Sequence, residues 1–147
     1  MRLWHQYIIS YLPNKQLLGQ HRELCALRGL GFGKKHSIVN YVFEHPYYYL
    51  YKYHMLVIKE MKKRNYKVNK VWYNSKYRGK NIGYDYSKFT NKCDVNELIY
   101  YEHNVFYLEE CLINLNRKGI NLMINKNDFL YKYLLDNSLL KYIKLID

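Results

Sequence analysis

Apolar residues recur at helical spacing in three long stretches of the chain, which predict three main helices. The first covers residues 14–28 and follows Pro13, whose fixed φ suits a first helical turn. The second opens at Pro46 and ends near Asn65, a residue type that tolerates the left-handed backbone found at helix ends. The third covers residues 108–119 and ends on a basic pair followed by glycine.

The first helix has two different faces. At 100° per residue, the side predicted to face the core holds Leu17, Leu18, His21, Leu24 and Cys25. The other side holds Gly19, Arg22, Glu23 and Ala26. A solvated face explains these four residues, and the two small ones also leave room for a bulky partner to approach the carboxylate of Glu23.

The rest of the chain gives weaker signals. Residues 31–42 and 67–90 lack a sustained period and are expected to be loops, the second with a basic group at residues 76–80. A capping box at Asp94 and Glu97 predicts a short helix, and residues 129–147 are expected to be helical. Near the N-terminus, the residues expected to pack on the domain are Trp4, Ile8, Ile9 and Leu12. Without a repeat or linker, the expected fold is all-α: a compact single domain over residues 1–147, with three main helices and long loops.

The net charge and the cysteines limit the kinds of partner and the cellular compartment that we expect for the protein. The 147-residue chain carries a net charge of +12, which favours a polyanionic partner. DNA is favoured over a membrane surface because no long basic amphipathic helix and no apolar run of about 18 residues is present. Three cysteines without a C-x-x-C pair, and no signal-peptide pattern, predict a reducing cytoplasm.

The histidines and cysteines do not follow a known metal-binding spacing. None of the six histidines belongs to an H-E-x-x-H motif or a Cys/His finger, so neither a metal site nor a cofactor is expected. His21 and Cys25 lie on the predicted core side of the first helix. They are therefore interpreted as a core histidine and an inert thiol.

Five short motifs carry a resemblance to a known family: MRLW at the start, QLLGQHREL in the first helix, KKH at 34–36, KEMKKRNY at 59–66 and YRG at 77–79. Over about residues 1–80 the chain resembles the pyrimidine-dimer DNA glycosylase family, and its start MRLWH is most similar to the small bacterial members. In that family an N-terminal α-amine attacks the deoxyribose C1′ and releases the damaged base. A glutamate of the first helix then promotes strand cleavage by β-elimination.

The resemblance implies a role for particular residues. It assigns the glutamate to Glu23 and the reactive amine to Met1, because Arg2 is too large for the usual removal of an initiator methionine. Gln16 stands where the prototype has a histidine, so the resemblance does not determine which lesion the protein recognises. The DNA-binding residues expected from the resemblance and from the basic loops are Arg2, Arg22, Arg28, Lys34, Lys35, His36, Arg78 and Lys80.

Elementary acid–base chemistry favours the same amine. An α-amine has a reference pKa of about 7.7–8.0 and a lysine one of about 10.4, so the α-amine is neutral roughly 300 times more often at pH 7. An internal lysine such as Lys35 is the competing imine former. The predicted function is a DNA repair glycosylase with AP-lyase activity, acting on double-stranded DNA as a nucleoid-associated monomer, with ultraviolet pyrimidine dimers as the first candidate lesion. The alternatives are a catalytically inactive nucleic-acid-binding protein of the same fold and a metal-dependent nuclease.

Overall fold

A computed structural model describes residues 2–30, 39–87 and 98–146, which cluster into two compact units. The first unit consists of Met1–Leu3 and Asn14–Tyr100, and the second of Trp4–Pro13 and Tyr101–Asp147. The expectation of one domain over residues 1–147 stays a prediction. In chain order, the elements are the 3₁₀ helix η1 (Gln6–Tyr11), α1 (Asn14–Leu30), η2 (Asn40–Glu44), α2 (Tyr47–Lys63), η3 (Lys70–Tyr73), α3 (Val105–Arg117), β1 (Leu122–Asn125), α4 (Phe129–Asp136), η4 (Leu140–Tyr142) and β2 (Ile143–Ile146).

Helices are present at the three predicted positions, as α1, α2 and α3, and the described chain is mainly helical. The additional helix α4 and the strands β1 and β2 depart from the expected all-α fold of three main helices. Two ends of the predicted helices follow from local sequence signals. Asn65 adopts φ 68° just after α2, and Gly119 adopts φ 78° just after α3. No helix in the described ranges is both long and apolar enough to cross a membrane.

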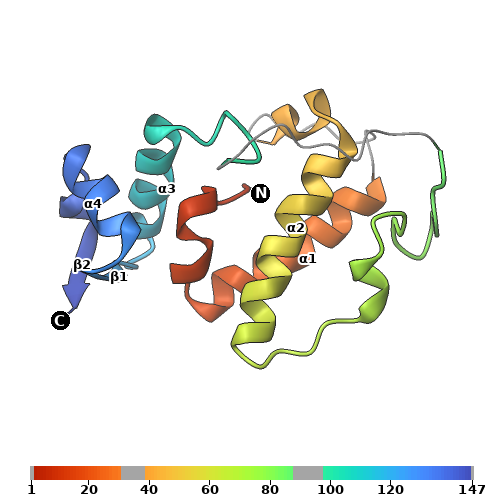
Figure 1. Ribbon diagram of the computed structural model, residues 1–147, viewed down its shortest axis with the longest axis horizontal. Coiled ribbons are helices and arrows are strands. Elements are labelled where there is room, and N and C mark those ends of the chain that lie inside the picture. Colours follow the sequence, from red (N-terminus) through yellow and green to blue (C-terminus); the bar gives the residue numbers. More distant parts are fainter. Residues whose placement is uncertain (1, 31–38, 88–97, 147) are drawn as a thin grey trace. The chain divides into compact units, whose positions relative to one another are not determined.

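In the first unit, α1 and α2 pack against each other (Figure 1). From α2, the residues buried in this core include Leu50, Tyr53, Val57, Ile58 and Met61. The buried side of α1 differs from the predicted one. Leu17 and Leu24 are buried as expected, but Leu18, His21 and Cys25 are only half-buried. Gln20, Leu27 and Arg28 are buried in their place, because α2 and the segment after η3 cover that flank of the helix.

The second unit contains a small sheet that the sequence did not predict. Strands β1 and β2 pair in parallel, with Leu122 opposite Ile143 and Asn125 opposite Ile146. The prediction of a helix over residues 129–147 is therefore correct only for α4, which ends at Asp136. Ser138 adopts φ 59° just after α4, in the left-handed region that ends the helix. The chain then leads into β2, which runs parallel to β1.

The N-terminal apolar residues pack as expected, and they do so in the second unit. Trp4, Ile8, Ile9 and Leu12 are all buried. His5 and His103 are also buried there, with their rings stacked 5.4 Å apart. The two imidazoles accept backbone hydrogen bonds, His5 from Tyr7 and His103 from Gln6.

Candidate functional site

The beginning of the chain is held against α1 in the first unit. The side-chain amide of Gln20 donates a 2.9 Å hydrogen bond to the backbone carbonyl of Arg2. The hydroxyl of Tyr53, on α2, donates to the amide oxygen of Gln20 at 3.1 Å. Gln20 is 1% exposed, so this network is shielded from water. The backbone next to residue 1 is thus anchored to a defined turn of α1.

Glu23 lies on α1 three residues after Gln20, on the same side of the helix. Its side chain is half-buried. Its Oε2 atom is buried and has no hydrogen-bond partner within the described part of the chain. Buried carboxylate oxygens are rarely left unpaired, because the lost hydration is not replaced. This oxygen is therefore available to a proton or donor that a ligand supplies.

Arg22 and Ala26 form the exposed part of the helix face that carries Glu23. The guanidinium of Arg22 extends over Gly19, where an added Cβ would lie 3.9 Å from Nη2. Small residues on either side of Arg22 leave this face open. The prediction that Arg22 and Ala26 face away from the core is confirmed.

Arg28 was expected to contact a phosphate, but its side chain is fully buried. All five N–H groups of its guanidinium are engaged. Their acceptors are the Tyr47 hydroxyl (2.8 Å), Nδ1 of His54 (2.9 Å) and the backbone carbonyls of Trp72 (3.0 Å), Asn74 (2.9 Å) and Tyr77 (2.9 Å). Arg28 therefore holds the segment after η3 against α1 and α2, and it has no donor left for DNA.

Arg78 is fixed at the end of that segment. Its Nε donates a 2.7 Å hydrogen bond to the backbone carbonyl of Arg28, and its Nη1 lies 3.4 Å from Oδ2 of Asp85. The guanidinium stacks on the ring of Tyr47, 3.8 Å from the centroid. Arg78 is 9% exposed, so only an edge of its guanidinium can reach a ligand.

That edge lies in a pocket of about 230 Å³, here called the basic pocket, lined by Ala26, Gly29, Arg78, Gly79, Lys80 and Asn81. The pocket brings two predicted DNA-binding residues, Arg78 and Lys80, next to Ala26 on the open face of α1. Its two cations and exposed location suit a phosphate.

Gly29 makes the basic pocket possible because α1 and the loop approach closely at this point. A Cβ on Gly29 would lie 3.1 Å from the backbone carbonyl oxygen of Arg78. On the loop side, Gly79 adopts φ 95°, which any other residue would adopt only with strain.

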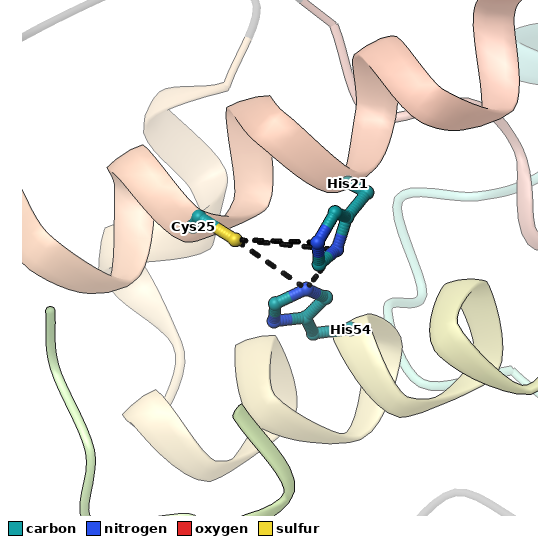
Figure 2. A group of neighbouring side chains, drawn as sticks. All are labelled: His21, Cys25 and His54. Atoms are coloured by element: carbon teal, nitrogen blue, oxygen red, sulfur yellow. Dashed lines mark hydrogen bonds between the residues drawn. The ribbon is translucent and has the colours of Figure 1, made fainter. Parts of the chain in front are cut away.

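On the flank of α1 toward α2, three side chains converge into what we call the His–Cys cluster: His21, Cys25 and His54 (Figure 2). Nδ1 of His21 lies 2.9 Å from Nε2 of His54, and Sγ of Cys25 lies 4.0 Å from Nε2 of His54. The sequence placed His21 and Cys25 one helical turn apart but could not show that His54, on α2, faces them.

The His–Cys cluster is uncharged at neutral pH. Burial lowers the pKa of His54 well below its usual range, and the neighbouring charge of Arg28 lowers it further. Burial also lowers the pKa of His21, with the charges of Arg22 and Arg28 adding to the effect. The pKa of the Cys25 thiol is raised to about 11 by burial, which agrees with the prediction of an unreactive thiol.

Four of the predicted site residues, Met1, Lys34, Lys35 and His36, lie outside the described residues. Among the described ones, the structure places Arg2, Arg22 and Glu23 along one part of α1, and Arg78 with Lys80 in the basic pocket. Sequence reasoning missed Gln20 and Tyr47. The sequence holds no clear signal for Gln20, which lies outside the predicted apolar side of the first helix and is known to be buried only from the structure.

Comparison with known proteins gives one family. The model of the family described as pyrimidine dimer DNA glycosylase matches residues 1–74, half of the chain. Neither the curated proteins nor the solved structures contain a match.

Proposed function

The chain belongs to the pyrimidine dimer DNA glycosylase family, and we propose that it excises damaged bases from double-stranded DNA and then cleaves the strand as an AP lyase, through an imine formed by the α-amine of Met1. The observation that carries this proposal is the anchoring of Arg2 by Gln20, one turn from the unpaired carboxylate oxygen of Glu23. The anchored backbone of Arg2 is the described part of the chain that adjoins residue 1, and the proposed mechanism requires the amine of that residue to reach the region of Glu23.

The proposed reaction begins with attack of the neutral amine on the deoxyribose C1′. The carbon–nitrogen bond to the base breaks, the base leaves with the bonding electrons and takes up a proton, and the amine loses its proton as the sugar ring opens to an imine. The protonated imine acidifies the neighbouring C2′. Removal of a C2′ proton expels the 3′ phosphate by β-elimination, and hydrolysis of the imine returns the amine.

Glu23 is the proposed acid–base residue in these steps. Its Oε2 has no donor among the residues that the structure describes, so we propose that it accepts a proton from the sugar or stabilises the cationic imine. Arg22, exposed on the same face, and the basic pocket with Arg78 and Lys80 are proposed to bind backbone phosphates, together with Arg2, Lys34, Lys35 and His36.

Borohydride trapping tests the proposal. Borohydride reduces an imine to a stable amine, so the enzyme becomes covalently attached to a lesion duplex only if the imine forms. The panel contains a cyclobutane-dimer duplex, an abasic duplex and an undamaged duplex. We expect adducts with the first two and label on Met1 after digestion and peptide sequencing.

The other outcomes identify the alternatives. Binding without an adduct indicates an inactive DNA-binding protein. Cleavage without an adduct that EDTA abolishes indicates a metal-dependent nuclease. Label on Lys35 moves the imine to an internal lysine and refutes the N-terminal mechanism. The intact mass of the purified protein shows whether Met1 is present in it.

A further inference from the structure

The His–Cys cluster has the composition and geometry of a metal site. His21 and Cys25 are four residues apart on α1, and His54 faces them from α2 (Figure 2). One ligand atom from each lies within 4.8 Å of the other two. We infer that His21, Cys25 and His54 together bind one Zn²⁺ ion, at a site separate from the proposed acid–base and phosphate-binding residues.

The distances between the ligand atoms are close to those that a common ion would impose. Zinc binds sulfur at about 2.3 Å and nitrogen at about 2.0–2.1 Å, so tetrahedral ligands lie about 3.3–3.6 Å apart. Here Nδ1 of His21 and Nε2 of His54 are 2.9 Å apart, and Sγ of Cys25 lies 4.0 Å from each of these two nitrogens. Side-chain rotations that shift each atom by a few tenths of an ångström bring all three onto one ion.

The donors select the kind of metal. Two imidazoles and a thiolate are borderline-soft ligands that suit Zn²⁺, whereas Mg²⁺ and Ca²⁺ prefer carboxylate and carbonyl oxygens. His54 is fully buried, and His21 and Cys25 are half-buried. The partly exposed side of the cluster leaves the fourth tetrahedral position to water.

Arg28 determines how the charge balances. A guanidinium only donates, so its 2.9 Å contact occupies the Nδ1 lone pair of His54 and leaves the ring proton on Nε2, where it bridges to His21. The incoming Zn²⁺ replaces this proton and the thiol proton of Cys25. Two protons leave as one dication enters, so the buried Arg28 gains no additional positive charge beside it. Arg28 and the metal then stabilise the imidazolate of His54 from its two nitrogens.

A metal at this point would join α1 to α2. The two helices also share the hydrogen bond from Tyr53 to Gln20, the residue that directly precedes His21 on α1 and that anchors Arg2. Binding that is specific for the folded state raises stability in proportion to the logarithm of the metal concentration. The expected role is structural, with the metal holding the helix that carries Arg22 and Glu23.

Metal titration of the full-length protein tests the inference. The probes are Zn²⁺, measured by metal content after gel filtration and by thermal denaturation, and Co²⁺, whose thiolate charge-transfer band reports a sulfur ligand. We expect one metal per chain, a Zn²⁺-dependent rise in Tm and a Co²⁺ band. The variant Cys25→Ala removes a half-exposed ligand and should lose the band and most of the Tm shift, whereas the control Cys111→Ala, which removes a buried thiol from α3, should keep both.

Three results would overturn the site: no retained Zn²⁺ and no band in the wild-type protein, a band that survives Cys25→Ala, or a band that disappears in Cys93→Ala instead. Because His54→Gln removes a partner of Arg28, it is used only if its folding is confirmed by circular dichroism, and it should then also lose the band. Borohydride trapping is scored separately. Trapping without metal binding refutes the zinc site alone, and metal binding without trapping refutes the proposed imine alone.

Discussion

The backbone carbonyl of Arg28 accepts a 2.7 Å hydrogen bond from Nε of Arg78, while the side chain of Arg28 donates to the carbonyl of Tyr77, the residue before Arg78. This reciprocal pair joins the last turn of α1 to the loop that lines the basic pocket. Arg28 therefore contributes to the proposed DNA-binding surface by holding the loop that lines the basic pocket.

We expect Arg28→Met to destabilise the fold strongly. Its backbone acceptors at residues 72 and 74 would lose this donor, and the carbonyl of Tyr77 would keep only the 3.4 Å hydrogen bond from the Tyr47 hydroxyl. At about 1–3 kcal/mol for each unsatisfied group, the free energy of unfolding should fall by at least about 2 kcal/mol, measured by urea denaturation. The control Arg64→Met, which removes a partly exposed i,i+4 ion pair with Glu60, should cost about 1 kcal/mol or less. Unchanged stability with weaker DNA binding would restore Arg28 as a phosphate contact.

Glu23→Gln should separate binding from catalysis. The substitution keeps the shape of the side chain and removes the charge from an unpaired buried oxygen, so Tm should stay the same or rise. Strand cleavage should fall by about 10²–10⁴-fold, the range for loss of a general acid–base group. Gel-shift affinity and single-turnover cleavage of the same lesion duplex give the two quantities. Equal cleavage by the variant and the wild type would remove Glu23 from the mechanism.

Duplex binding should depend steeply on salt, since each cation–phosphate contact releases counterions. Arg22→Ala should weaken binding equally for all sequences and lower the slope of log K against log salt by about 1, without loss of stability, because Arg22 is exposed. Arg117→Ala removes the same charge from an exposed position at the end of α3 and serves as the matched control. If both variants give the wild-type slope, Arg22 does not contact phosphate.

Two glycines of α1 should respond to alanine in opposite ways. Gly19→Ala places a methyl group at an ordinary 3.9 Å from Arg22 and should stabilise the helix by up to about 1 kcal/mol. Gly29→Ala places it 3.1 Å from the Arg78 carbonyl oxygen, so the loop must move away and the basic pocket must change shape. We expect a lower Tm and weaker DNA binding for Gly29→Ala alone. Indistinguishable variants would show that the approach of α1 to the loop has no role in binding.

Stability should fall as the pH drops below about 6.5. Burial lowers the pKa of His5 to about 4 and that of His103 to about 3, so both stay neutral in the folded protein while the unfolded chain takes up protons near pH 6.5. Their contribution is therefore fully present above pH 6.5 and should decline by a few kcal/mol toward pH 4. His21 and His54 shift in the same direction.

Urea denaturation at a series of pH values measures this decline. His5→Asn with His103→Asn keeps an acceptor close to each Nδ1 position and removes both titrating groups, so the profile should flatten. A wild-type profile that is already flat between pH 7.5 and 4.5 would contradict the buried neutral histidines.

The helices could be predicted from the sequence because their signals are local. Pro46, Asn65 and Gly119 mark helix ends through their own backbone preferences, and the apolar spacing between them needs no knowledge of the partner. The strands could not be predicted, since β1 has only four residues and exists through its pairing with residues 143–146. Four residues are too few to show a period.

The burial of Arg28 could not be predicted for a related reason. The family resemblance assigns Arg28 to DNA binding, and only the carbonyls of residues 72, 74 and 77 explain why it lies inside. Likewise, His54 faces His21 and Cys25 only because of the way in which α2 packs on α1. In contrast, Glu23 could be singled out by the R-E-L match, and its unpaired oxygen is a structural observation that the sequence does not contain.

The division of the chain into two units has a consequence for dissecting the protein. The family match ends at residue 74, but residues 1–74 do not correspond to a folding unit. A fragment that ends there would leave the apolar side chains of η1 without their packing partners, which come from the C-terminal third. It would also lack Tyr77 and Arg78, which form hydrogen bonds with Arg28 at the end of α1. The segment that carries the family signature therefore depends for its shape on the part of the chain that the signature does not cover.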